Sequence, residues 1–423
     1  MPAHFLLTTF GSLGDLHPYI AVGRGLRARG HAVTIATSEV YRTKIEGEGL
    51  RFHPARPDVG AFLNDPESMR RAFDARTGSE YIVRHFFMKH VAESYEDLLP
   101  AAREADLIVG HPVSFATPIV AEKLGKRWIS VALAPVAMLS VYDPPVAPGA
   151  PDIERFRRLG PWFWRLYWFM GRRVVRAWGE QANRLRAELG LRPVRNPVLD
   201  DMFSPYGMQA WFSHVLARPQ RDWPRDTVVT GFPFYDRLEP GHGMNPELSR
   251  FLASGPPPVV FTLGSSAVFH AGDFYRESIE AARLAGCRAV LLLGRDPRNR
   301  LSGTLPETVF VDEYAPYSDL FPRAAATVHQ GGVGTTAQAL ASGRPMIVMP
   351  CSHDQPDNAA RVTRLGVART IQRDQYRAER VAAELGVLLG EASYAAKARQ
   401  TAGEMAKEDG VAAACEGLIR DVG

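Results

Sequence analysis

A histidine, three glycines and two threonines follow an apolar stretch in AATVHQGGVGTTAQALASG, residues 325–343. The pattern predicts a strand that leads directly into a glycine-rich turn and then a helix. The N–H groups and positive dipole end of such a helix attract anions, and glycines let a ligand approach the backbone. Thr335 and Thr336 add hydroxyl donors, and His329 can donate a ring N–H, or a full charge, to a phosphate oxygen. We therefore expect a phosphate site. The structural alternative is a tight turn around a buried, hydrogen-bonded histidine.

Two common phosphate motifs do not describe this turn. The sequence has no GxxxxGK[ST], and its glycine spacing differs from that of the dinucleotide fingerprint. It also contains no DxD. We therefore expect no metal-bridged diphosphate, no metal site and no cofactor beyond the substrates themselves.

The composition is typical of a soluble globular chain. Its 423 residues are 46% hydrophobic and 23% charged, with a formal net charge of +4. Basic residues are scattered, so no binding stripe for nucleic acid is expected. Cys287, Cys351 and Cys415 lie far apart without CxxC spacing, which predicts free thiols in a reducing cytoplasm. No signal peptide or membrane-spanning apolar run is visible, and we expect a cytoplasmic protein.

Strand and helix patterns alternate near the N-terminus. HFLLTTF (4–10) and HAVTIATS (31–38) predict strands, and LHPYIAVGRGLRARG (16–30) predicts the helix between them. DLIVGH (106–111) and WISVALAP predict further strands around the helix SFATPIVAEKLG (114–125). Apolar strands joined by helices indicate a parallel α/β sheet that is covered on both faces.

The alternation restarts after FPFYDRLEPGHGMNPELSRFL (232–252), which is rich in proline and glycine. The segments PVVFTLGS, RAVLLLG, TVFVDEYA, AATVHQGG and RPMIVMP then predict strands with helices between them. We expect two doubly wound Rossmann-like α/β domains that face each other across a cleft, at 1–235 and 247–409, with a linker at 236–246. Residues 410–423 should form a terminal helix that is able to pack back on the N-terminal domain.

The glycine-rich turn and SHDQPDNAARV (352–362) together resemble the donor-binding signature of GT-B glycosyltransferases. The likeness is strongest to the bacterial branch of the UDP-glycosyltransferase superfamily, which includes sterol, macrolide-antibiotic and rhamnolipid sugar transferases. GSLGDLHPYIAVGRGLRARGH (11–31) resembles that family's acceptor-side first loop, and VVFTLGSS (259–266) its opening donor-side strand. The resemblance therefore implies a GT-B fold, with an acceptor-binding first domain and a nucleotide-sugar-binding second domain.

The resemblance assigns the donor diphosphate to the glycine-rich turn. His329 and the neighbouring backbone N–H groups would hold the phosphates, with help from Ser265 at the end of the first donor-side strand. The turn residues covered by the family's motif are Gly331, Gly332, Gly334, Thr335 and Thr336.

The rest of the nucleotide sugar is assigned in the same way. Tyr314 would stack on the base, and Ala315 would bind the base edge through its backbone. Asp354 and Gln355 would bind sugar hydroxyls, because a carboxylate accepts while an amide donates and accepts; the alternative for Asp354 is a loop cap. Many UDP-sugar enzymes of the family have a ribose-binding Glu where this chain has Ala337, which favours a deoxyribose donor such as a dTDP-sugar. Some UDP-dependent sterol enzymes lack it too.

Transfer to a hydroxyl needs a base on the attacking side and stabilisation of the departing diphosphate. Bacterial members of the family use the Asp of G-D-V-x-P, here Asp15 in GSLGDLHP. Plant relatives have His there and a partner Asp after a later strand, where this chain has His111. The resemblance thus implies an exchanged pair, Asp15 and His111, in an inverting displacement. A strand-end histidine bonded to backbone is the alternative for His111, and His17 is a rival base.

An aromatic run, PWFWRLYWFMGRRVVRAWG (161–179), has six aromatic residues from Trp162 to Phe169. It is a core-facing helix, a wall for a hydrophobic acceptor, or an interfacial helix whose arginines meet anionic headgroups. The second interpretation suits a phenolic, sterol, macrolide or lipid acceptor. The third allows a weak peripheral membrane contact.

Three other functions compete with sugar transfer. A nicotinamide-dependent oxidoreductase would use Glu39, which ends the second strand, as its ribose-binding acid, but GSLGDLH lacks the third glycine. A GT-B sugar-nucleotide 2-epimerase would need no hydrophobic acceptor, and a non-catalytic partner could keep the fold. The residues do not identify the acceptor, the sugar, the donor base or the atom that is glycosylated, nor the oligomeric state.

Overall fold

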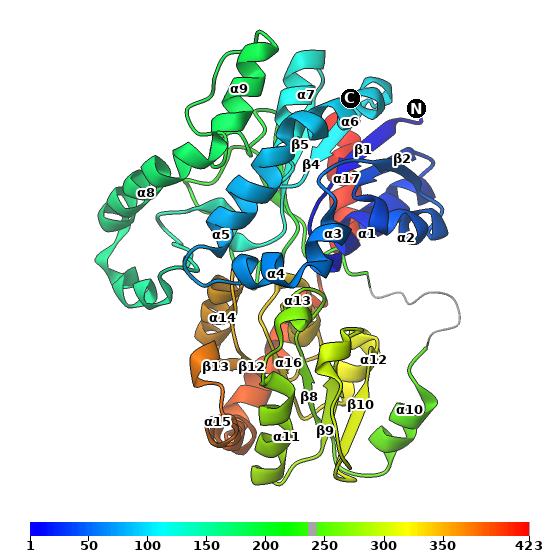
Figure 1. Ribbon diagram of the computed structural model, residues 1–423, viewed down its shortest axis with the longest axis vertical. Helices are drawn as coiled ribbons and strands as arrows, with labels where there is room; N and C mark the ends of the chain where they lie inside the picture. The colour runs from blue at the N-terminus through cyan, green and yellow to red at the C-terminus, as the bar shows by residue number, and fades with distance from the viewer. Residues whose placement is uncertain (236–242, 423) are drawn as a thin grey trace. The chain divides into compact units, whose positions relative to one another are not determined.

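The computed structural model describes residues 1–235 and 243–422, which divide into two compact units (Figure 1). Unit 1 comprises Met1–Tyr235 and Glu408–Gly423, and unit 2 comprises Asp236–Lys407. Residues 236–242 of the linker that we expect at 236–246 lie outside the described residues. Each unit is a doubly wound α/β structure with a parallel sheet, as the sequence predicts.

Unit 1 is built on a seven-stranded sheet of order β3-β2-β1-β4-β5-β6-β7 in which all neighbours are parallel. Its strands are β1 (His4–Thr8), β2 (Ala32–Thr37), β3 (Arg51–Pro54), β4 (Leu107–Gly110), β5 (Trp128–Ala132), β6 (Met208–Ala210) and β7 (Thr227–Val229). Its α-helices are α1 (Leu13–Ala28), α2 (Arg42–Gly47), α3 (Val59–Asn64), α4 (Pro66–Ala72), α5 (Gly78–Glu80), α6 (Val91–Glu104), α7 (Ala116–Leu124), α8 (Pro161–Arg176), α9 (Glu180–Glu188) and α17 (Gly410–Val422).

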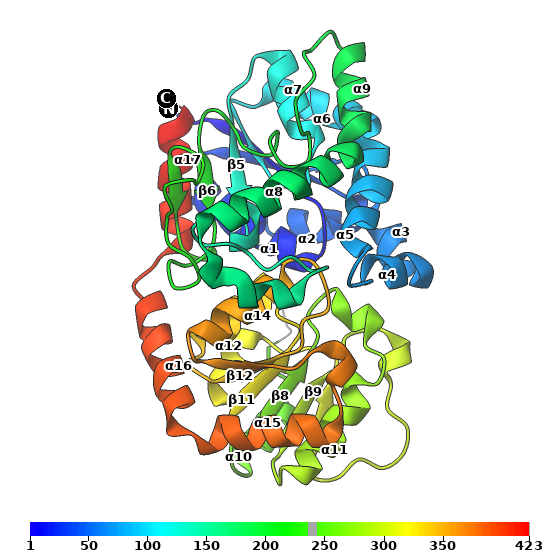
Figure 2. The same cartoon turned by 90° about the vertical axis from the view of Figure 1, so that its left-hand side faces the viewer.

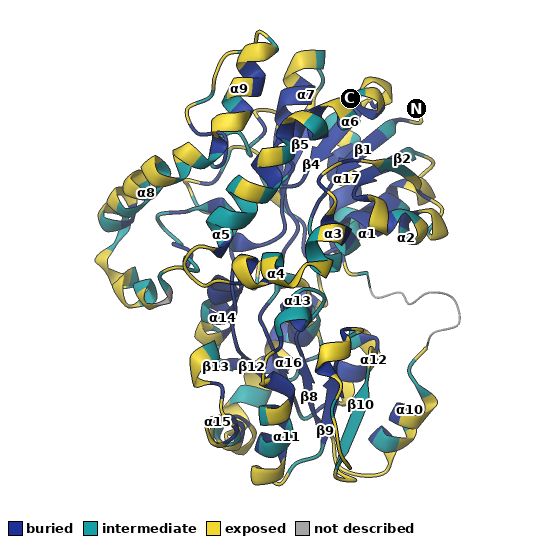
Figure 3. Ribbon diagram, viewed as in Figure 1, coloured by how far each residue is buried: buried dark blue, intermediate teal, exposed yellow. Residues whose placement is uncertain are grey.

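Helices cover both faces of this sheet, which explains why its central strands are mostly apolar. Leu6 of β1 belongs to a core cluster with residues of α6 and α7. Its neighbour Leu7 points the other way, because a Cβ at Gly23 of α1 would lie 3.5 Å from Leu7 Cδ1. Successive side chains on a strand alternate between faces, so a strand that is buried on both sides loses the polar positions. The central strands are accordingly dark blue in Figure 3.

The C-terminal helix α17 packs against α1 within unit 1 (Figure 2). Gln209 Nε2 donates to the carbonyl of Ala414 at 3.2 Å, and Cys415 Sγ lies 3.5 Å from the carbonyl of Val22. The contact needs a residue without a side chain on α1. A Cβ at Gly25 would come within 2.7 Å of both Cys415 Sγ and Val411 Cγ1.

Unit 2 has a six-stranded parallel sheet of order β10-β9-β8-β11-β12-β13. Its strands are β8 (Val259–Thr262), β9 (Ala289–Leu292), β10 (Val309–Asp312), β11 (Ala326–His329), β12 (Met346–Val348) and β13 (Ala368–Thr370). Its α-helices are α10 (Pro246–Ala253), α11 (Phe274–Leu284), α12 (Tyr317–Leu320), α13 (Val333–Ala341), α14 (Gln355–Arg364), α15 (Ala378–Gly390) and α16 (Ala392–Met405).

Each sheet has one point at which the chain reverses its direction of winding. In unit 1, β2 and β3 lie on one side of β1, and β4 begins the other side. In unit 2, β9 and β10 lie on one side of β8, and β11 begins the other. Loops diverge at such a switch point, so a crevice opens outside the carboxyl ends of the two strands. The residues that follow β1, β4, β8 and β11 are therefore the ones placed to bind ligands.

The packing of α17 on α1 gives a stability prediction. Gly25→Val should lower the free energy of unfolding of unit 1 by about 1–3 kcal/mol, because the new side chain overpacks the contact with α17. It should also speed proteolysis within Val411–Val422. Urea unfolding and limited proteolysis measure the two effects. Gly47→Val is the matched control, because a Cβ at that α2 position meets nothing within 4 Å. Wild-type stability of Gly25→Val would contradict the packing argument.

Candidate active site

The glycine-rich turn joins buried strand β11 to helix α13, as the sequence predicts. Gly331 has φ +86°, a conformation that favours glycine, and a Cβ there would lie 2.6 Å from Val348 Cγ1. Gly332 is the N-cap of α13 and offers no side chain to it. The first N–H groups of a helix have no intrahelical acceptors. They therefore point out of this turn as donors, except that of Val333, which donates to Asp354 Oδ2 at 3.2 Å.

His329 ends β11 as a neutral donor. Its Nδ1 accepts the N–H of Gly331 at 3.0 Å, so the proton of the neutral ring sits on Nε2. The side chain is fully buried, and this burial lowers the pKa of His329 to about 3. Nε2 has no hydrogen-bond partner among the described residues. Of the two donors expected from sequence, a ring N–H or a full charge, the geometry favours the neutral N–H.

Other buried polar atoms near the turn also have no partner within the described ranges. They are Gln330 Oε1, Thr336 Oγ1, Ser352 Oγ and Asn358 Oδ1. Buried polar groups in folded proteins are nearly always hydrogen-bonded, and exceptions mark functional sites or ligand positions. Asn358 also ties α14 to the turn, because its Nδ2 donates to the carbonyl of Gly331 at 2.9 Å. The turn and the start of α14 thus form one polar site.

Asp354 and Gln355 lie at the start of α14, next to the turn. Asp354 Oδ2 accepts from Asn358 Nδ2 at 2.7 Å and from the N–H of Val333, and its side chain makes no capping bond to its own helix. Gln355 Oε1 accepts the N–H groups of Cys351 and Ser352, at 2.8 and 3.2 Å. The Gln355 carbonyl is therefore used by the loop, and its amide N–H groups are what it can offer a sugar.

A buried ion pair lies within α14. Arg361 Nε donates to Asp357 Oδ2 at 2.7 Å, and both side chains are almost fully buried. The two residues are four positions apart on the same helix, so the pair stabilises α14 itself.

The turn after β8 meets the turn after β11. The two strands pair with Thr262 opposite His329. Gly264, with φ +65°, allows a close approach: a Cβ there would lie 2.3 Å from Gln330 Nε2 and 3.2 Å from Thr335 Oγ1. Ser265 follows Gly264 directly. The structure therefore brings Ser265 and the histidine turn to one place.

Tyr314 and Ala315 follow β10, which β9 separates from β8. The Tyr314 ring is 45% exposed, as a stacking residue needs, whereas Ala315 is buried. Tyr317 links Tyr314 to the end of β8. The rings of Tyr314 and Tyr317 are 6.4 Å apart, and Tyr317 Oη lies 2.9 Å from Oγ1 of Thr262, the last residue of β8. Tyr314 and Ala315 thus lie farther along the sheet edge than the glycine-rich turn does.

Asp15 and His111 meet in unit 1. Asp15 lies in the first turn of α1 after β1, and His111 follows β4, which pairs with β1. Asp15 Oδ1 is 3.4 Å from His111 Nε2. The Asp15 side chain is 34% exposed and that of His111 only 7%. Of the two, Asp15 is the group that an acceptor can reach.

The surroundings of the pair orient it. Asp15 Oδ2 accepts from the backbone N–H of Ser12 at 2.7 Å and from its hydroxyl at 3.2 Å, in a capping box. His111 Nδ1 accepts the N–H of Val113 at 3.3 Å, which leaves Nε2–H to face Asp15. Gly11, with φ +128°, must be glycine, because a Cβ there would lie 2.3 Å from Asp15 Oδ2. The role of Ser12 was not predicted from the sequence, although the pattern S-x-x-D before a helix indicates a capping box.

His17 occupies a different environment from Asp15. Its ring packs on Tyr235 with 4.8 Å between centroids, and burial and the nearby Lys44 charge lower the pKa of His17 to about 3. A ring that resists protonation is a poor general base. Glu39, the acid of the oxidoreductase alternative, is exposed and pairs with Arg42 at 2.5 Å.

Two family models and several curated proteins match the chain. The model of the erythromycin biosynthesis protein CIII-like C-terminal domain matches residues 287–418, and the glycosyltransferase family 28 N-terminal domain matches 5–142. The O-mycaminosyltylonolide 6-deoxyallosyltransferase of Streptomyces fradiae is 33% identical over 417 residues, covering 97% of this chain and 95% of that protein. A sterol 3-beta-glucosyltransferase of Cryptococcus neoformans is 28% identical over 451 residues, and these span 100% of this chain but 27% of that protein.

Solved structures with the same fold support this relationship. The glycosyltransferase of kitacinnamycin superposes with a TM-score of 0.76 at 21% identity, covering 100% of both chains. The glycosyltransferase VinC, solved in complex with dTDP, has a TM-score of 0.66 at 19% identity and 99% coverage of both chains. At these identities the likeness concerns the fold alone. With the Streptomyces fradiae relative, it shows that the chain belongs to the bacterial branch of the UDP-glycosyltransferase superfamily and is a GT-B glycosyltransferase.

Proposed function

We propose that this glycosyltransferase moves a hexose from a dTDP- or UDP-sugar to a hydroxyl group of a hydrophobic small molecule, with inversion at the anomeric carbon. The observation that carries the proposal is the His329 side chain: a neutral N–H donor, buried and unpartnered within the described residues, beside the N-terminus of α13. Such a donor suits a phosphate oxygen that gains negative charge as it leaves.

On the donor side, the proposed roles follow from hydrogen-bonding capacity. His329 Nε2–H, the Thr336 hydroxyl and the first N–H groups of α13 would bind diphosphate oxygens. Ser265 would add a hydroxyl, and Asp354 and Gln355 would hold sugar hydroxyls. Tyr314 would stack on the base, with Ala315 at the base edge. The His329 ring is held by the N–H of Gly331 and the backbone N–H groups by α13, so these donors need little reorganisation when charge develops.

On the acceptor side, Asp15 is the proposed general base. The acceptor O–H gives its proton to Asp15 Oδ1 while its oxygen attacks the anomeric carbon, and the bond from that carbon to the phosphate oxygen breaks with its electron pair on the nucleoside diphosphate. His111 acts by position: its Nδ1 accepts from Val113 and its Nε2–H faces Asp15. The ring is thereby placed to hold the carboxylate in position.

The donor nucleotide follows from position 337. Ala337, on α13, is buried and has no group that could bind ribose hydroxyls. We infer a preference for the deoxyribose nucleotide. The solved dTDP complex of VinC, a protein of the same fold, is consistent with this preference.

The acceptor class is inferred from the relatives. Their names specify a macrolide substrate, O-mycaminosyltylonolide, and sterols. A macrolide-like or sterol-like alcohol is therefore the first choice, ahead of phenols and simple lipids. Mass spectrometry of products from dTDP- and UDP-sugars crossed with such acceptors tests the proposal. If the protein converts a nucleotide sugar without any acceptor, that result would favour the 2-epimerase alternative. If it binds NAD tightly and binds no pyrimidine diphosphate, that result would favour the oxidoreductase alternative.

The role of His329 predicts a large loss on truncation. His329→Ala should lower kcat/KM by roughly 10²-fold or more, because one phosphate donor is removed. Since burial lowers the pKa of His329 to about 3, the ring is neutral throughout the neutral range, and the loss should be equal at mildly acid and mildly alkaline pH. His329→Gln, which keeps an N–H donor, should recover part of the rate. An unchanged kcat/KM in a folded His329→Ala protein would mean that the turn is only structural.

If Asp15 is the general base, replacing it should slow the chemical step without weakening nucleotide binding. Asp15→Asn keeps size and hydrogen bonding but removes basicity, so kcat should fall about 10²–10⁴-fold while the Kd for dTDP stays constant. His111→Ala should cost a similar factor, and the double variant little more, because the two residues act as one unit.

His111→Gln separates a positioning histidine from a proton relay. The amide keeps an N–H that can face Asp15 but cannot carry a proton, so a positioning role predicts that much of the activity returns and that the pH profile is unchanged. Near-normal turnover of Asp15→Asn, together with inactive His111→Ala or His17→Ala, would assign the base to a histidine.

Position 337 predicts the nucleotide preference. Wild-type enzyme should use a dTDP-sugar at least as well as its UDP counterpart, and Ala337→Glu should shift the ratio of kcat/KM values toward UDP, because a carboxylate can accept both ribose hydroxyls. Gln338→Glu places the same charge one residue away and is the matched control. A wild-type kcat/KM about tenfold higher for UDP-glucose than for dTDP-glucose, a difference of about 1.4 kcal/mol in activation free energy, would refute the inference.

A further inference from the structure

Helix α8 turns an apolar face to solvent. Trp162, Leu166, Met170 and Val174 follow one another at intervals of four residues, which places them in one ridge along the helix. They are 64, 53, 62 and 64% exposed, and Phe169 beside them is 49% exposed. The preceding 3-10 segment η5 (Pro151–Leu159) adds Phe156 and Leu159, which are also exposed. Figure 3 shows the resulting exposed stretch at the edge of unit 1.

The exposed ridge is not a frayed end, because the other side of α8 is anchored to unit 1. Trp164 is buried, Arg172 pairs with Asp200, and Asn196 Nδ2 donates to the carbonyl of Arg172 at 3.0 Å. Arg165 reaches Tyr142 Oη at 2.9 Å. The core-facing interpretation of the aromatic run thus accounts for one side of the helix only.

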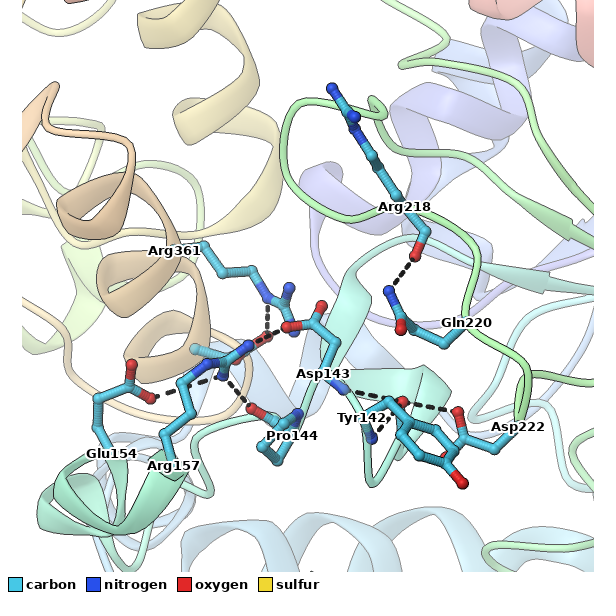
Figure 4. Close-up of polar contacts among 11 residues, drawn as sticks. Tyr142, Asp143, Pro144, Glu154, Arg157, Arg218, Gln220, Asp222 and Arg361 are labelled. Carbon is cyan, nitrogen blue, oxygen red and sulfur yellow. Dashed lines mark hydrogen bonds and ion pairs between the residues drawn. The ribbon is translucent and has the colours of Figure 1, made fainter. Parts of the chain in front are cut away.

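The segment η5 is anchored as well. Arg157 donates to the carbonyl of Pro144 at 2.8 Å and pairs with Asp143, and Glu154 lies 3.8 Å from the same guanidinium (Figure 4). These bonds connect η5 to the segment that follows β5. Both α8 and η5, which together form the apolar surface, are therefore held on unit 1 by hydrogen bonds and ion pairs.

The charge of this surface is mostly positive, and its acidic residues, Asp152 and Glu154, both lie in η5. Helix α8 contains four arginines and no acidic residue. Among residues 1–235 and 243–422, no ion pair is formed by Arg158, Arg165, Arg173 or Arg176. Arg165, Arg172 and Arg176 follow at spacings of seven and four residues, so they lie along one flank of the ridge. Arg173 lies over the Phe169 ring, 5.3 Å from its centroid.

We propose that the α8–η5 surface docks on an anionic lipid surface. An amphipathic helix with large apolar side chains and flanking arginines lies in the plane of a membrane interface, with the apolar ridge among the acyl chains and the arginines at the phosphates. Trp162 is suited to that boundary, because its ring is apolar and its N–H can bond to headgroups. No helix among the described residues is long and apolar enough to span a membrane, so the contact is peripheral.

The charge pattern selects lipid over a second copy of the chain. In a two-fold dimer the same surface faces itself, so the arginines of two α8 helices, neither of which contains an acidic residue, would be brought together. The surface is also a single projecting helix, which spans about 18 Å from Trp162 to Val174. A short ridge of this kind predicts weak, reversible and salt-sensitive binding.

Vesicle flotation with the full chain, without substrate, tests the proposal. Wild-type protein should float with phosphatidylcholine vesicles that contain phosphatidylglycerol at low salt, and should bind vesicles of phosphatidylcholine alone far more weakly. Leu166→Glu/Met170→Glu should lose binding by tenfold or more. Arg173→Gln/Arg176→Gln should lose roughly fivefold per arginine on the anionic vesicles only. Leu284→Glu, at a position of α11 that is 45% exposed, is the matched control and should bind like wild type.

Thermal unfolding and sugar transfer in solution check that each variant is folded. Absence of wild-type binding to anionic vesicles would overturn the proposal, and so would binding that Leu166→Glu/Met170→Glu leaves intact. Conversion of a wild-type dimer to a monomer by that double variant, seen in sedimentation, would assign the surface to a second copy instead. The measurement contains no donor or acceptor, so it does not depend on the proposed reaction.

Discussion

Two sets of candidate site residues, Asp15 with His111 and Ser265 with His329, are each positioned by the parallel pairing of two strands at a switch point. In unit 1 the pairing of Thr8 with Gly110 places the loops of Asp15 and His111 side by side. In unit 2 the pairing of Thr262 with His329 brings the turns of Ser265 and the histidine together. Shifting a strand by one residue would turn every side chain to the opposite face, so burial on both faces fixes the register strongly. The positions of the site residues therefore follow from the packing of the two cores.

Within this framework the glycine-rich turn after β11 combines low charge with high hydrogen-bonding capacity. His329 is neutral, and buried atoms of Gln330 and Thr336 nearby have no partner in the part of the chain that the structure describes. Leaving buried polar groups without partners destabilises a fold, each by about 1–3 kcal/mol. Folds keep such groups where binding offsets the loss, as at preorganised sites. A neutral donor also avoids burying a full charge in the free enzyme, which would cost much more.

Part of this arrangement could be predicted from the sequence, and there are physical reasons why the rest could not be predicted. The strand ending at His329 and the helix after the glycines have clear periodicity. Strands β6, β7 and β13 have three residues each, too few to show a period. The protonation state of His329 could not be predicted, because it results from burial by residues distant in sequence. The roles of the site residues stay predictions.

Helix α8 shows a different limit of sequence reasoning. Apolar residues lie all around it except along the arginine flank, so periodicity does not indicate which half faces the core. Trp164 and Trp162 are two positions apart, yet one is buried and the other is exposed. The burial of Trp164 and the bonds made by Arg165, Arg172 and Asn196 orient the helix on unit 1.

The chemistry of the proposed base follows from how firmly Asp15 is held. Oδ2 accepts two hydrogen bonds from Ser12, and Oδ1 lies 3.4 Å from His111 Nε2, so Oδ1 is the oxygen proposed to take the proton of the acceptor. A carboxylate is far less basic than an alkoxide, so it cannot deprotonate an alcohol before the attack begins. The proton must therefore move as the bond to the anomeric carbon forms and the hydroxyl becomes acidic. In the proposed mechanism the diphosphate therefore leaves as the attack proceeds, and the donors around His329 would act on the same step as the base.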